Sequence, residues 1–152
     1  MGFPPQGTDG RTGLLEVERS LAPATENDAV SWAVNTEQSL GAKDITVNIP
    51  AGASIVSVIA MVRINMMNNA ATAQTIDLRL NVEGTTLFNQ TDIVGFGAVL
   101  GASAVYVIAE DASDEVTSNG QVVTLEALET LLNSASVTFQ AQYYLFITYR
   151  LS

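Results

Sequence analysis

The segment VTFQAQYYLFITYRL, residues 137–151, alternates between two kinds of side chain along its whole length. Its odd-numbered residues, from Val137 to Leu151, are apolar or aromatic, whereas most of its even-numbered residues are Thr, Gln or Arg. A period of two is typical of a β-strand whose two faces meet different surroundings. The segment therefore predicts a long C-terminal strand with one face in the core. Tyr144 and Phe146 interrupt the polar face, where we expect them to be covered by the second sheet or by a subunit neighbour.

The same period recurs upstream. Residues 45–49 and 76–82 alternate between apolar and polar side chains. In residues 55–66 the even-numbered side chains, from Val56 to Met66, are all apolar and would form one face of a strand. Weaker extended patterns follow at 85–94 and 105–109. About eight strands with no alternation of strand and helix predict an all-β protein, an antiparallel β-sandwich, and we expect a jelly roll.

This pattern divides the chain into two parts. Residues 1–42 are expected to form an N-terminal arm and an irregular lead-in, because Gly and Pro are frequent in residues 1–13 and Pro23 interrupts the part that follows. Residues 43–152 are expected to form a single β-sandwich domain.

One segment departs from the period of two. Leu125, Leu128, Leu131 and Leu132 fall at helical spacing behind Thr124, which is a suitable N-cap, so a short helix is predicted at 125–133. Just before it, Asn119-Gly120 between Val116 and Val122 predicts a hairpin with a type I′ turn.

Composition excludes much chemistry. The chain has no His and no Cys, which removes Ser/His/Asp triads, disulfides and the usual zinc or iron–sulfur sites. Its formal net charge is −10 and its few Lys and Arg residues are scattered, so we expect no binding to nucleic acid. No apolar run approaches the ~20 residues that a membrane span needs. Charged residues make up 14% of the chain, below the roughly 25% of an ordinary soluble domain, which favours packing against other proteins. Because the N-terminus has no apolar export segment, we expect synthesis in the cytoplasm.

Two loops invite a chemical interpretation. GFGAVLG at 95–101 superficially resembles a dinucleotide-binding turn, but a strand rather than a helix is predicted after it, so we expect no cofactor there. Glu110, Asp111, Asp114 and Glu115 supply oxygen ligands of the kind that Ca²⁺ prefers, although the order of an EF-hand loop is missing. We expect a solvated acidic turn without metal, and a Ca²⁺ site is the alternative.

The arm contains apolar anchors for protein contacts. Burying the side chain of Phe3, Leu14 or Leu15 on a partner would contribute about 1.5–3 kcal/mol for each residue. An ordinary disordered terminus is the alternative. The candidate interaction residues are Phe3, Pro4, Pro5, Leu14 and Leu15.

The Pro/Gly-rich arm, the low-charge β domain rich in Ala, Thr, Asn and Val, and the absence of Cys and His together resemble the small decoration, or cement, proteins of tailed-bacteriophage heads. The resemblance lies in organisation over most of the chain and includes no signature motif. It implies a non-enzymatic virion protein, commonly a homotrimer, that is made in the host cytoplasm and sits on the capsid exterior. Its implied partners are the major capsid protein and further copies of itself.

Two other functions remain open at this point. A tail-associated or host-recognition β-sandwich that binds a glycan or a receptor would have the same strand pattern and neutral polar loops. A hydrolase that uses a pair of carboxylates is compatible with the composition, although no pair is marked in the sequence.

Overall fold

The computed structural model of the chain describes residues 12–17, 25–27, 34–68, 73–96, 101–132 and 137–150. Side chains are described at 34–68, 73–93, 101–132 and 137–150. Over these ranges the chain forms nine strands: β1 (Thr12–Val17), β2 (Thr25–Asn27), β3 (Gln38–Thr46), β4 (Ser54–Asn68), β5 (Gln74–Val82), β6 (Thr85–Phe96), β7 (Ser103–Asp111), β8 (Val122–Leu131) and β9 (Val137–Arg150).

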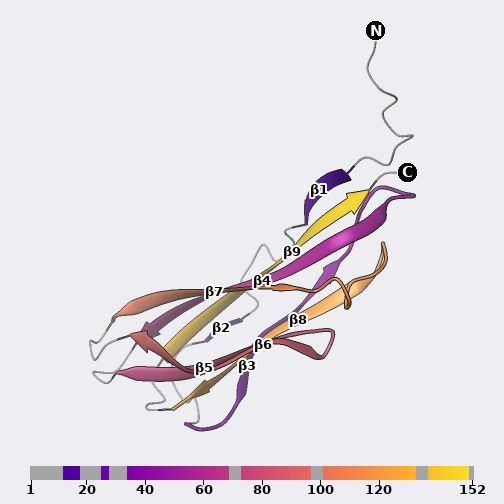
Figure 1. Cartoon of the computed structure of the whole chain (residues 1–152). Helices are drawn as coiled ribbons and strands as arrows, with labels where there is room; N and C mark the ends of the chain where they lie inside the picture. Colours follow the sequence, from indigo (N-terminus) through magenta and orange to yellow (C-terminus); the bar gives the residue numbers. More distant parts are fainter. Residues whose placement is uncertain are drawn as a thin grey trace.

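The strands make two antiparallel sheets that form the two layers of a β-sandwich (Figure 1). One sheet has the order β1-β9-β4-β7, with β2 also paired to β9, and the other has the order β3-β8-β5-β6. With β2 set aside, the chain switches between the sheets at every connection except the β5–β6 hairpin. This four-plus-four order is that of a jelly roll, so the predicted fold class is confirmed.

The first sheet is built around β4 and β9. These two strands pair over almost their whole length, from Ser54 opposite Arg150 to Asn68 opposite Val137. The odd-numbered residues of β9 from Val137 to Ile147 point inward and are buried, as the alternation predicts. They pack with inward side chains of β4, β5 and β8 into one hydrophobic core.

One residue predicted on the apolar face of β4 lies outside the core. Val56 is 48% exposed, whereas Val58, Ala60, Val62 and Ile64 on the same predicted face are buried. The register shifts between Ile55 and Ser57, where β4 carries one more residue than β9. Such a bulge reverses the alternation locally, which turns Val56 outward.

The helix predicted at 125–133 is wrong. Val122–Leu131 is strand β8, which pairs with β3 on one side and β5 on the other. Val123, Leu125, Ala127 and Leu131 are buried, so the period of two that the core uses is present beneath the leucine spacing. Pairing on both sides satisfies the backbone of β8 and outweighs helical propensity. Residue 133 lies outside the described part of the chain.

The turns at Glu83-Gly84 and Asn119-Gly120 have different backbone conformations. Glu83 and Gly84 have φ angles of 50° and 78°, as the two central residues of a type I′ turn require, and they close the β5–β6 hairpin. At Asn119-Gly120 only the glycine has a positive φ, 84°, and Val116 lies in a loop rather than a strand. The predicted type I′ hairpin at 119–120 is therefore wrong, because the segment before it turns back at Ala112 to Val116 instead of extending.

Candidate interaction surface

The sheet that contains β4, β7 and β9 has an unusually apolar outward side. We define the outer face as the outward side chains of β4 from Ser57 to Met67, of β7 from Ser103 to Asp111, and of β9 from Thr138 to Thr148. Its large exposed apolar side chains are Ile59, Met67, Val105 and Val107. Apolar side chains gathered on one face in this way mark an interaction site more often than scattered single ones do.

Tyr144 and Phe146 extend this apolar surface across β9. Both are half-buried, and their rings stack with centroids 6.2 Å apart and an interplanar angle of 17°. Phe146 lies opposite Ile59, and Tyr144 lies opposite Met61. The two rings predicted on the second face of the C-terminal strand thus belong to the outer face and not to the core.

The polar side chains of the outer face bind one another. The Arg63 guanidinium donates from Nη1 to Oε1 of Gln142 at 3.4 Å, and the Asn65 amide donates to Oε1 of Gln140 at 3.3 Å. A shallow depression of about 190 Å³ lies here, with Asn65, Met67, Ser103 and Gln140 among its lining residues. The oxygens of Gln140 and Gln142 thus have partners within the sheet, whereas Oδ1 of Asn65 is buried without one.

The opposite side of the sandwich has a different character. On the β3-β8-β5-β6 sheet the outward residues include Asp44, Asp77, Arg79 and Glu126. Arg79 also forms an ion pair with Glu37, just before β3. A surface of this kind is typical of a solvated face, so the two outer sides of the sandwich are not equivalent.

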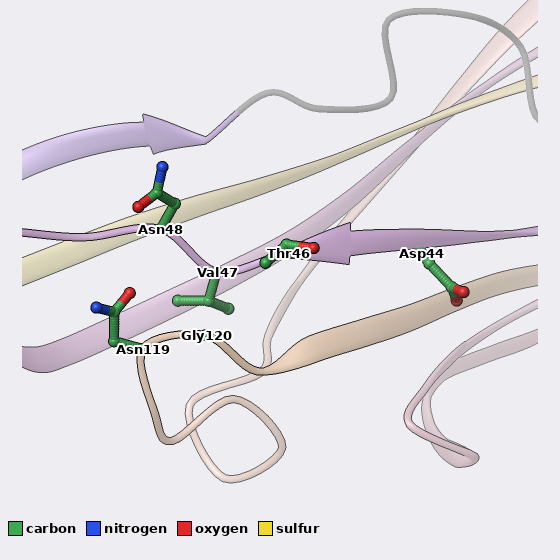
Figure 2. Close-up of a pocket in the computed structure, with 6 residues that line it drawn as sticks. All are labelled: Asp44, Thr46, Val47, Asn48, Asn119 and Gly120. Carbon is green, nitrogen blue, oxygen red and sulfur yellow. The ribbon is translucent and has the colours of Figure 1, made fainter.

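A second, polar depression lies at the end of β3 (Figure 2). It measures about 480 Å³, and its lining residues are Asp44, Thr46, Val47, Asn48, Asn119 and Gly120. Asn48 and Asn119 come from two neighbouring segments, and Asp44 lies apart from them along β3 (Figure 2). Two of these side chains have structural roles: Asn119 Oδ1 accepts the Ile49 N–H at 2.9 Å, and Asp44 Oδ1 accepts the Thr124 hydroxyl at 2.7 Å.

The acidic turn after β7 is organised by its own hydrogen bonds. Asp111 Oδ1 accepts the backbone N–H of Ser113 at 2.9 Å as well as the hydroxyl of that residue, and these bonds lower the pKa of Asp111. The Ser113 Oγ in turn accepts the Val58 N–H at 3.0 Å, which ties the turn to β4. Among the residues that the structure describes, no three acidic, His or Cys side chains gather in a way that could hold a metal ion.

The GFGAVLG segment also has a structural explanation. Gly95 lies within β6, Gly101 has a φ of 81° in the turn that precedes β7, and residues 97–100 lie outside the described part. The element that follows is strand β7, as predicted, and not the helix that a dinucleotide-binding turn needs.

One buried ionisable group has no counterpart in the sequence interpretation. Glu129 is 1% exposed, lies on the inward side of β8 opposite Leu78 and Gln38, and neither of its carboxylate oxygens has a hydrogen-bond partner. Burial raises the pKa of Glu129 to about 8, and the negative charge of Glu37 adds to this shift. The side chain is therefore mainly protonated near neutral pH. Sequence reasoning missed it because a helix at 125–133 places an acidic residue on its solvated surface.

The predicted arm residues are only partly described. Phe3, Pro4 and Pro5 lie outside the described residues. Leu14 and Leu15 lie in β1, where they pair with Thr148 and Ile147 of β9. Their contact role stays a prediction.

Comparisons with known proteins identify similar structures but no family. No family model and no curated protein matches the chain. The solved structures that it resembles include the insecticidal delta-endotoxin Cry8Ea1 from Bacillus thuringiensis, with 21% identity and a TM-score of 0.46 over 74% of this chain and 18% of that one. A second is the VP2 subviral particle of infectious bursal disease virus, with 11% identity and a TM-score of 0.42 over 97% of this chain and 36% of that one.

A third is dimeric latent PorU from Porphyromonas gingivalis, with 10% identity and a TM-score of 0.41 over 94% of this chain and 13% of that one. This chain thus spans between 13% and 36% of the length of these three proteins. At these identities and TM-scores, no function is transferred from them. No helix in the described residues has the length and apolar character of a membrane span.

Proposed function

We propose that the protein is a non-enzymatic structural component of a virion that binds the exterior of a phage capsid shell as a decoration, or cement, protein. The observation that carries the proposal is the outer face, whose exposed Ile59, Val105 and Val107 are suited to contact with protein. The major capsid protein and further copies of the chain are the proposed partners. The organisation of the sequence, described above, supports the same role.

Physical reasons favour such a task for a small sandwich. A shell repeats each contact by symmetry, so modest interfaces gain strength through multivalency. A formal net charge of −10 keeps the protein soluble and away from nucleic acid, while the neutral outer face remains available for a partner.

Binding to undecorated shells tests the proposal. Purified protein would be added to shells of the virus or provirus whose genome encodes it, and co-sedimentation and the melting temperature of the shells would be measured. We expect saturable binding and a raised melting temperature. Shells that neither bind the protein nor gain stability would overturn the proposal.

A truncated copy tests the arm in the same experiment. Removal of residues 1–11 deletes Phe3, Pro4 and Pro5 but leaves β1, which begins at Thr12. If the arm grips the shell, this copy binds more weakly although its fold is intact. Light scattering of both copies gives the number of subunits and shows whether the truncation changes it.

The polar depression at the end of β3 favours a second candidate function, recognition of a host glycan. Hydroxyl and amide side chains such as Thr46 and Asn48 are suited to hydrogen-bonding sugar hydroxyls. Retention of the protein on specific members of a glycan array, lost in Asn48→Ala, would support this function if shells are not bound. Asn119 is unsuitable for such a variant because it holds the Ile49 backbone.

A further inference from the structure

We propose that the outer face pairs with the outer face of a second copy of the chain, around a twofold axis that runs across the strands at the level of Met61. The proposal rests on the proposed function only in treating this face as a protein-binding surface. It adds the occupant and the geometry of the contact.

The register of the sheet places the side chains of the outer face in rows across β9, β4 and β7. Met61 lies between Tyr144 of β9 and Ala109 of β7. On one side of this row lies the row of Phe146, Ile59 and Asp111, and on the other the row of Gln142, Arg63 and Val107.

The charges of the outer face are self-complementary. Arg63 and Asp111 are its charged residues, and they stand in the two rows on either side of Met61. A twofold axis along the Met61 row exchanges these rows between the copies, so Arg63 of one copy faces Ile59 of the other. The Asp111 of that other copy is then one strand away, about 4.8 Å to the side, which an arginine side chain reaches. Each dimer would contain this contact twice.

The charge of the whole molecule limits where two copies can meet. Two copies that each have a formal net charge of −10 repel one another, so a stable contact needs a face that adds no further repulsion. On β4, β7 and β9 the outer face has one positive and one negative residue, and β1 and β2 place Glu16 and Glu26 in register with Phe146 and Gln140 at its margin. A contact centred on β4 and β7 therefore uses the part of this sheet where the charges balance, away from Glu16 and Glu26.

The apolar side chains provide the attraction. In the paired arrangement Met61 and Tyr144 lie at the centre, where contacts contribute most, and Val107 lies in the next row, opposite Asp111 of the other copy. Methionine side chains such as Met61 and Met67 adapt to an irregular opposing surface. The amide oxygens of Gln140 and Gln142 already accept hydrogen bonds within each copy, whereas Oδ1 of Asn65 has no partner.

A matched pair of valines tests the proposal in solution. Val107 on the outer face is 53% exposed, and Val122, outward on β8 of the other sheet, is 52% exposed. Sedimentation equilibrium of the full chain and of its Val107→Asp and Val122→Asp variants would be measured over a range of concentrations. We expect a dimer for the wild type and for Val122→Asp. For Val107→Asp we expect association weakened by about 100-fold or more, because each new carboxylate is placed opposite Asp111 of the other copy.

Cross-linking tests the position of the axis even if Val107→Asp fails to fold. The chain has no cysteine, so Ala109→Cys in the Met61 row introduces a single reactive site. Facing sheets lie about 10 Å apart, farther than a disulfide spans, so a short bis-maleimide is the suitable reagent. We expect covalent dimers from Ala109→Cys and none from Val122→Cys.

Three outcomes would overturn the pairing: a wild-type monomer at every concentration, a trimer, or equal cross-linking by the two cysteine variants. A monomer whose Val107→Asp variant no longer binds shells would assign the outer face to the shell protein instead. The proposed function would then stand while the twofold pairing would fall. A dimer that does not bind shells would support the twofold pairing and overturn the proposed function.

Discussion

At the scale of single residues, the alternation in β-strands predicts which side chains are buried but not what burial does to them. Glu129 shares the inward side of β8 with Leu125 and Leu131, and it is as deeply buried as they are. Its position follows from the period of two once β8 is known to be a strand. The absence of hydrogen-bond partners for its carboxylate cannot be predicted from this period, because it depends on strands β3 and β5, which are distant in sequence.

The raised pKa of Glu129 predicts that the protein loses stability as pH rises. The carboxyl titrates near its ordinary value of 4.5 in the unfolded chain and at about 8 in the folded one. Between these values the folded state holds a proton that the unfolded state has released, so the free energy of unfolding falls by up to about 1.4 kcal/mol per pH unit. Above the folded pKa the decline ends. Urea unfolding at a fixed protein concentration, at several pH values from 5 to 8, measures this slope.

Glu129→Gln removes the titrating group while keeping its shape. We expect the variant to gain stability relative to wild type as pH rises, which flattens the slope. Glu126→Gln, on the outward side of the same strand, is the control, because it leaves Glu129 in place. Equal slopes in wild type and Glu129→Gln would show that Glu129 is not the group responsible.

The buried hydroxyl of Tyr143 joins strands from both sheets. It donates to the carbonyl of Gly41 in β3 and accepts the Ala127 N–H of β8 at 2.9 Å. Burial raises the pKa of Tyr143 to about 12, so the hydroxyl keeps the proton that it donates. Tyr143→Phe should lower the free energy of unfolding by about 1–3 kcal/mol, since it leaves two backbone groups without this partner.

Tyr144→Phe provides the comparison for this measurement. The Tyr144 hydroxyl makes one long contact of 3.5 Å with Gln142 on the outer face, so its removal should change the stability of the fold little. Similar losses for the two variants in urea unfolding would mean that the ring of Tyr143, and not its hydroxyl, matters.

At the scale of elements, a strand is predictable where the local pattern and the pairing agree. The alternation in residues 55–66, 76–82 and 137–151 predicts β4, β5 and β9, because one face of each strand lies in the core. In β8 the leucines also match a helical period, and only pairing with β3 and β5 decides between the two. The outer face was missed in part for a related reason: two apolar faces of one strand do not reveal which of them is inside.

The β5–β6 turn predicts a graded response to substitution. Gly84 has a φ of 78°, and nothing lies within 4 Å of the Cβ that a substitution would add, so a new side chain meets conformational strain rather than a clash. Gly84→Ala should lower the free energy of unfolding by about 1 kcal/mol. Gly84→Asn should lower it less, because Asn tolerates left-handed backbone better. Thermal unfolding of the two variants measures the difference, and an Ala variant as stable as the Asn variant would contradict the expectation.

At the scale of the whole molecule, strands from the two ends of the chain pair with each other at one edge of the first sheet. β1 pairs with the last residues of β9, from Thr12 opposite Arg150 to Val17 opposite Leu145, and β2 covers β9 from Phe139 to Ala141. An N-terminal segment therefore shields one edge of the most apolar strand. Sequence alone could not predict this closure, because the local pattern of residues 12–17 is short and the partner strand lies at the other end of the chain.

Two truncations separate this shielding from any contribution of the preceding residues. Removal of residues 1–17 deletes β1 and leaves the edge of β9 open from Leu145 to Arg150, next to the rings of Tyr144 and Phe146. An open, apolar strand edge pairs with other chains, so this copy should unfold at lower urea and aggregate on standing. Removal of residues 1–11 keeps every β1–β9 pair and should behave as the full chain does. Urea unfolding and light scattering at matched concentration measure both effects. If the two truncations are equally stable and equally free of aggregates, β1 does not protect the sheet. The twist and side chains of β9 would then be enough to prevent its open edge from pairing with other chains.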